Sequence, residues 1–137
     1  MIVLCDTNVL IDQLAGGPRG QVARARLNSL RRDGHSVVVV PQILAEFFVV
    51  CTKPKLSNGL GLEADAATAA IRYLMAHLPV VYDDVTTVTA WLALVGVGVK
   101  GKRAHDARIA ALVIAGKVDA VLTSNVSDFR PFGVKLA

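Results

Sequence analysis

The sequence has no hydrophobic run that approaches the length of a membrane-spanning helix, although 53% of its 137 residues are hydrophobic. A helix that crosses a bilayer needs about 20 consecutive apolar residues. The longest runs here, such as Val37–Val40 and Ile109–Ala115, have the length of core elements. The first residues, Met1–Cys5, lack the basic segment that opens a secretory signal. These absences predict a cytoplasmic protein that has no membrane segment.

Cysteine is scarce, and nothing divides the chain into parts. The two cysteines, Cys5 and Cys51, do not have the spacing of a metal site or a redox motif, and their apolar neighbours favour buried thiols. Repeats, low-complexity stretches and linkers are absent, so we expect one domain over residues 1–137. A chain of this length buries enough surface to fold without disulfides.

Acidic residues are in the minority, with 11 Asp and Glu against 15 Lys and Arg, which gives a net charge of +4. A basic surface favours a polyanionic partner such as RNA. The excess is modest, and a net charge of this size also occurs in proteins that bind no nucleic acid. The positions of the acids are therefore more informative than their number.

Short apolar segments alternate with helical patterns along the chain. The expected strands are residues 1–5, 36–40, 80–82, 120–123 and, as a short fifth strand, 133–136. The expected helices are residues 7–14, 21–32, 41–52, 63–78 and 104–115, with a further helix that Asp83 or Asp84 caps and that runs to Val95. Alternating strands and helices imply right-handed crossovers and a parallel sheet. The predicted fold is α/β, with three α/β/α layers around a central, mostly parallel sheet of four to five strands.

Four acidic residues occupy positions that this fold brings to one edge of the sheet. Asp6 directly follows the first strand and Asp128 lies just beyond the fourth, and open parallel sheets bind ligands outside the carboxyl ends of their strands. Glu46 falls within an apolar helical stripe, where a carboxylate is costly unless it is paired or binds a metal. Asp106 begins the apolar row of its own helix and lies in the first turn.

Each of these acids also has a structural explanation when it is taken alone. Asp6 and Asp106 suit ordinary helix N-termini, Glu46 could pair with a basic side chain, and Asp128 could be a turn residue. Taken together, four converging carboxylates would repel one another strongly without a cation. Oxygen ligands favour Mg²⁺ or Mn²⁺. Such a cation can activate water and neutralise the charge of a phosphate.

The order of these segments resembles the PIN-domain family, and in particular the VapC-type toxins of bacterial toxin–antitoxin pairs. The similarity covers the whole chain and rests on Asp6–Ile11 after the first strand, Glu46, the segment His105–Ala111, and Thr123–Asn125 followed by Asp128 and Phe129. The resemblance implies a metal-dependent endoribonuclease that hydrolyses RNA phosphodiester bonds. It also implies a homodimer and a cognate antitoxin protein that silences the enzyme.

The resemblance assigns roles to the acids and to some of their neighbours. Asp6 and Asp106 match the core metal ligands of the family, and Glu46 matches its second acid. Either Asn125 or Asp128 fills the fourth position, and we favour Asp128. In that case Asn125 and Thr123 support the pocket through hydrogen bonds.

Other residues near the acids have two interpretations each. Thr7 and Asn8 either orient Asp6 or only cap the following helix. His105 lies about 100° around the helix from Asp106, so we expect no catalytic role for it. The candidate RNA contacts are the basic residues Lys100, Lys102, Arg103 and Arg108. On the long helix, a row of apolar residues either forms a homodimer face or packs in the core: Ile71, Leu74, Met75 and Leu78.

Two other phosphate-handling classes fit the sequence less well. A haloacid-dehalogenase phosphatase needs a second Asp two residues after the first, where this chain has Asn8. An HD-type phosphohydrolase needs further histidines, and only His35 and His77, on unrelated elements, are available. The alternative that stays open is a catalytically inactive PIN-like module that binds RNA or a protein partner.

Overall fold

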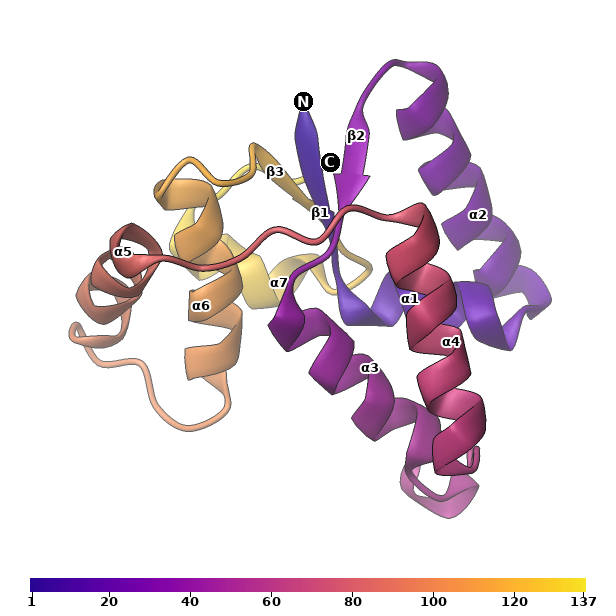
Figure 1. The fold of residues 1–137 in the computed structure, drawn as a ribbon. Helices are drawn as coiled ribbons and strands as arrows, with labels where there is room; N and C mark the ends of the chain where they lie inside the picture. The colour runs from indigo at the N-terminus through magenta and orange to yellow at the C-terminus, as the bar shows by residue number, and fades with distance from the viewer.

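The computed structural model describes residues 1–137 as a parallel sheet with helices on both sides (Figure 1). In chain order, its elements are β1 (Ile2–Cys5), α1 (Thr7–Ala15), α2 (Gly17–Arg32), β2 (Ser36–Val38), α3 (Pro41–Thr52), η1 (Lys55–Ser57), α4 (Ala64–His77), α5 (Val85–Val95), α6 (Arg103–Ile114), β3 (Ala120–Leu122), α7 (Val126–Phe129) and η2 (Arg130–Phe132). Helices α5 and α6 lie to the left of the strands in Figure 1, and α2 and α4 lie to the right. The predicted α/β class is confirmed.

The sheet has three parallel strands in the order β2-β1-β3, so the N-terminal strand is the central one. Val3 of β1 is paired with Val37 on one side and with Ala120 on the other. The sheet is smaller than the predicted four to five strands, because the two remaining segments each form a single bridge, Val39 to Val80 and Val121 to Leu136. Segment 80–82 follows Pro79, which has no N–H with which to extend the ladder.

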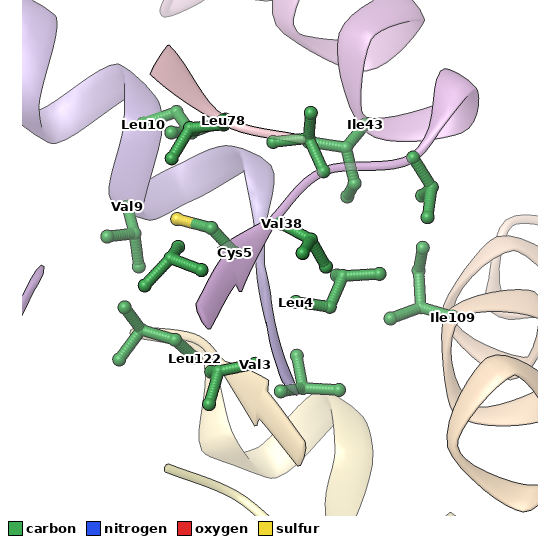
Figure 2. Packing of buried hydrophobic residues seen from close by; sticks show 14 of the residues in the cluster. Val3, Leu4, Cys5, Val9, Leu10, Val38, Ile43, Leu78, Ile109 and Leu122 are labelled. Carbon is green, nitrogen blue, oxygen red and sulfur yellow. The ribbon is translucent and has the colours of Figure 1, made fainter. Parts of the chain in front are cut away.

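The central strand is buried on both faces, as its unbroken apolar sequence predicts. Val3, Leu4 and Cys5 are fully inaccessible to solvent. Figure 2 shows Cys5 on the side of α1 and Leu4 on the side of Ile109, which belongs to α6. Packing on both faces and pairing along both edges fix the carboxyl end of β1, where Asp6 follows.

Helices α1 and α2 are joined more tightly than the sequence suggests. The gap expected between the helices 7–14 and 21–32 is a single residue, Gly16, whose φ of 77° is in the left-handed region, and α2 begins at Gly17. Proline in the first turn of a helix loses no intrahelical hydrogen bond. Gly20 packs so closely on α1 that a Cβ atom at this position would lie 2.7 Å from the carbonyl oxygen of Asp12.

Most of the apolar row on α4 serves the core. Leu78 is buried, and Ile71 and Leu74 pack against the main hydrophobic cluster, whereas Met75 is 49% exposed. Both cysteines are buried free thiols, as predicted, and burial raises the pKa of Cys5. None of the helices combines the length and the hydrophobicity needed to cross a bilayer.

Candidate active site

Asp6 lies at the carboxyl end of the central strand and is held there by its own backbone and side chain. Its N–H donates to the carbonyl of Leu122 over 2.9 Å, which continues the pairing between β1 and β3. Its Oδ1 accepts from the N–H of Thr7 (2.8 Å), so the residue caps α1. Its Oδ2 accepts from Nδ2 of Asn8 (2.9 Å) and from the hydroxyl of Thr123 (2.7 Å). Thr7 and Asn8 therefore orient Asp6, whereas the cap of α1 is Asp6 itself.

Thr123 connects this carboxylate to the far end of the chain. Its Oγ1 accepts from the backbone N–H of Asn125 (3.0 Å), while the side chain of Asn125 is exposed at the pocket and makes no hydrogen bond. Arg26 of α2 donates to the carbonyl of Thr123 (3.1 Å) and to that of Ala137 (2.9 Å). Arg26 could not be identified from the sequence, because a half-buried arginine and a solvated one look alike there.

Glu46 projects from α3 and is fixed by two donors. Its Oε2 accepts from the hydroxyl of Thr7 (2.8 Å), and its Oε1 accepts from Nε2 of Gln42 (2.8 Å). The same Nε2 donates to the carbonyl of His105 (3.0 Å), so Gln42 joins α3 to the first turn of α6. The Oε1 of Gln42 is buried and has no hydrogen-bond partner. Gln42 was not among the predicted residues, although a Gln one turn before an acid is a known helical pairing.

Asp106 and Asp128 differ from the other two acids because their carboxylates have neither a hydrogen bond nor an ion pair. Each lies half-buried in the first turn of a helix, α6 and α7 respectively. Burial raises the pKa of Asp106 to about 6, and repulsion by Asp128 and Asp6 adds to this effect, while Arg103 opposes it. Burial also raises the pKa of Asp6, with a contribution from Glu46. The site thus concentrates negative charge, and neither a hydrogen bond nor an ion pair offsets the charge of Asp106 and Asp128.

These side chains line one cavity of about 800 Å³. Of the eight predicted acidic and supporting residues, the structure brings seven together on its walls, all except Thr123: Asp6, Thr7, Asn8, Glu46, Asp106, Asn125 and Asp128. In the conformation described, no group of three or more His, Cys, Asp and Glu side chains is arranged to hold a metal ion. The donor chemistry nevertheless fits a hard divalent cation, because the acids offer only oxygen and two of them are free to turn.

The predicted basic residues divide into two pairs. Lys102 and Arg108 line the cavity, but Lys100 and Arg103 do not. The guanidinium of Arg103 instead lies 5.8 Å from the ring centroid of Phe132, in cation–π contact. His105, for which we expected no catalytic role, also reaches the cavity wall. The basic rim of the pocket is therefore smaller than predicted.

Comparison with known proteins gives the following similarities. A family model described as "PIN domain" matches residues 2–127. No curated protein sequence matches the chain. The fold is similar to VapBC2 from Rickettsia felis bound to a promoter DNA fragment, with a TM-score of 0.73 and 17% identity over 100% of this chain and 98% of that one. It is also similar to VapBC-1 from nontypeable Haemophilus influenzae (TM-score 0.72, 19% identity, 100% and 97% covered) and to FitAcB from Neisseria gonorrhoeae (0.69, 19%, 99% and 96%).

Proposed function

This chain belongs to the PIN domain family, and on that basis we propose that it is an endoribonuclease that depends on Mg²⁺ or Mn²⁺. The observation that carries the proposal is the convergence of Asp6, Glu46, Asp106 and Asp128 on one cavity. Four different parts of the chain supply these acids. Carboxylates that raise each other's pKa values destabilise the fold, and a function at this cavity explains why they lie together.

The four acids would contribute to cation binding in two ways. Asp6 and Glu46 are preset by hydrogen bonds, and Asp106 and Asp128 can rotate toward the ion because nothing else binds them. When bound, a divalent cation supplies Lewis acidity, which activates water and stabilises the charge of a phosphate during hydrolysis. We propose Asp6 and Asp106 as the core ligands, with Glu46 and Asp128 completing the set.

The remaining side chains of the cavity position the acids and the substrate. Thr123 and Asn8 hold Asp6, and the N–H of Asn125 holds Thr123 in turn. Lys102 and Arg108 offer positive charge to the phosphodiester at the rim of the cavity. These contacts would place an RNA backbone beside the carboxylates without neutralising them.

The distribution of charge also suits an RNA substrate. Five of the 11 acidic residues and two of the 15 basic residues line the cavity. The rest of the molecule therefore carries six acids against thirteen Lys and Arg, a stronger basic excess than the net charge of +4 suggests. A basic surface around an acidic site attracts the polyanion and leaves the site available for a cation.

The decisive experiment is cleavage of total cellular RNA by the purified protein in Mg²⁺ or Mn²⁺. Asp6→Asn is compared with Asp33→Asn, a matched change at an exposed acid beyond the end of α2. We expect discrete fragments from the wild type and from Asp33→Asn, and none from Asp6→Asn or in EDTA. Absence of cleavage with every divalent cation, in protein free of any bound inhibitor, would refute the proposal.

The second candidate function is a PIN-like module that binds RNA without cutting it. It is favoured by the absence of a preformed group of three metal-binding side chains. Fluorescence anisotropy with a labelled RNA separates the two functions. A nuclease loses cleavage but keeps RNA binding after Asp6→Asn, whereas a binding module shows no cleavage in either form.

We further propose a toxin role with a cognate antitoxin, and a homodimeric state. The similar VapBC folds support the first, and the family membership supports the second. Induced expression in a bacterial host should arrest growth for the wild type but not for Asp6→Asn. Light scattering should give twice the chain mass of 14.5 kDa. Normal growth at high expression or a monomer mass would contradict the respective proposal.

A further inference from the structure

A second cavity, of about 330 Å³, lies between α5 and α6. Its walls are formed by Asp83, Thr87, Val88, Trp91, Ala104, His105 and Arg108, and we refer to it as the side pocket. His105 and Arg108 line the side pocket and the acidic cavity alike, so the two adjoin across these side chains. A ligand that occupies the acidic cavity can therefore extend into the side pocket.

One wall of the side pocket is aromatic and held in place. The indole Nε1 of Trp91 donates to the carbonyl of Ala104 over 2.8 Å, which ties the ring of α5 to the start of α6. Val88, one turn before, is 44% exposed and adds aliphatic surface. Unstacked RNA bases bind by stacking on aromatic side chains. The wall thus offers the flat, apolar surface that a base requires.

The polar part of the side pocket is an ion pair between Asp83 and Arg108, in which one carboxylate oxygen of Asp83 is free. Nε of Arg108 donates to Oδ2 of Asp83 over 2.8 Å, and Nη2 forms an ion pair with the same oxygen at 2.6 Å. The Oδ1 of Asp83 has no hydrogen bond, and the side chain is only 16% exposed. A carboxylate oxygen accepts from the exocyclic amino group of adenine, cytosine or guanine. Uracil has no amino group, and its ring N–H lies between two carbonyl oxygens. A carboxylate repels these two oxygens.

We propose that the side pocket binds a nucleobase next to the phosphate in the acidic cavity, and that it prefers an amino-bearing base to uracil. The proposal rests on the ribonuclease function proposed above. Arg108 lies between the two cavities, where the backbone of a bound strand would pass, and its charge suits a phosphate. A cavity of this size is at the lower end of the range for small-molecule sites and holds one base with its sugar.

The test uses the only tryptophan of the chain as a reporter, because Trp91 is in the pocket wall. Its fluorescence is followed while hexanucleotides of A, C or U are added in EDTA, where a metal-dependent nuclease does not cut. The same titration is made with Val88→Glu and Val85→Glu. Both changes add one negative charge at an exposed position of α5, but only Val88 lines the pocket.

We expect saturable changes in emission with the A and C hexanucleotides and binding at least about threefold weaker for U. Val88→Glu should weaken binding of the A hexanucleotide roughly tenfold, while Val85→Glu stays within about twofold of wild type. The proposal would be overturned if Trp91 emission stayed unchanged while anisotropy showed that RNA was bound. It would also be overturned if Val88→Glu and Val85→Glu bound the A hexanucleotide with equal affinity. Base binding without cleavage in Mg²⁺ or Mn²⁺ would support the side pocket and refute the nuclease function. Cleavage without any change in Trp91 emission would support the nuclease function and refute the side pocket.

Discussion

Removal of one uncompensated carboxylate should stabilise this protein in the absence of metal. Asp106 is the position of choice, because its side chain makes no hydrogen bond and its pKa is raised from 3.8 to about 6. An acid whose pKa is higher in the folded state contributes stability that is complete below about pH 4 and is lost as the pH rises through about 6. Asp106→Asn replaces the carboxylate with a neutral group of the same shape and removes this loss.

The size of the effect follows from the pKa shift. A shift of about two units corresponds to about 3 kcal/mol at about 1.4 kcal/mol per unit. Asp106 is only half-buried, so solvent reduces both the cost of burying its charge and the repulsion by its neighbours, and we expect about 1 kcal/mol. For a domain of this size, that raises Tm by about 3–5 °C. The gain should be present at pH 7.5 and should nearly vanish at pH 4.5, where the wild-type carboxyl is protonated.

Thermal unfolding in EDTA at the two pH values measures this difference. Asp33→Asn, which changes an acid far from the cavity, should show no gain that depends on pH. Added Mg²⁺ should raise the Tm of the wild type at pH 7.5 and raise that of Asp106→Asn less, because the variant lacks one ligand. An Asp106→Asn protein that is less stable than wild type at pH 7.5 in EDTA would show that burial and the neighbouring carboxylates do not penalise the charged Asp106 side chain.

Three further changes test the supports of the site. Gln42→Met removes both hydrogen bonds that Nε2 makes, to Glu46 and to His105. It should lower the cleavage rate about tenfold and leave the RNA affinity unchanged. A fall in RNA affinity alone would assign Gln42 to substrate binding. Thr123→Val keeps the volume but deletes the hydroxyl that donates to Asp6. It should lower the free energy of unfolding in urea by about 1–3 kcal/mol. An unchanged urea midpoint would mean that this hydrogen bond is not needed for stability. Gly20→Ala should destabilise the fold although alanine favours helices, because its Cβ would meet the Asp12 carbonyl at 2.7 Å; a rise in Tm would show that α1 can move aside.

The sequence was sufficient to predict the positions of the four acids, because each prediction depended on local pattern. Asp6 follows an apolar strand directly, and Glu46 interrupts a helical stripe whose other members, Ile43 and Phe47, are buried. The class of fold came from the same alternation of strands and helices. The number of strands was overestimated, because an apolar segment of three residues does not reveal whether it forms a ladder or one bridge.

The contacts between distant residues could not be predicted. The sequence left open whether Asp83 or Asp84 caps α5, and the structure gives the two acids separate roles. Asp84 caps the helix through the N–H of Thr87 and pairs with Lys117, a hydrogen bond that lowers the pKa of Asp84, whereas Asp83 pairs with Arg108. These partners lie 25 or more residues away, and nothing in the local pattern selects one acid over its neighbour.

The arrangement of the sheet has a consequence for the order in which the protein is made. Thr123, whose hydroxyl donates to Asp6, lies 117 residues after it in the chain and is therefore synthesised later. The strand that pairs with β1 on this side, β3, and helix α7, which carries Asp128, are likewise synthesised long after Asp6. A ribosome-bound fragment that stops before β3 can form the β1–β2 pair but not the acidic cavity. A growing chain therefore cannot assemble the acidic cavity until β3 and α7 have been synthesised and have folded.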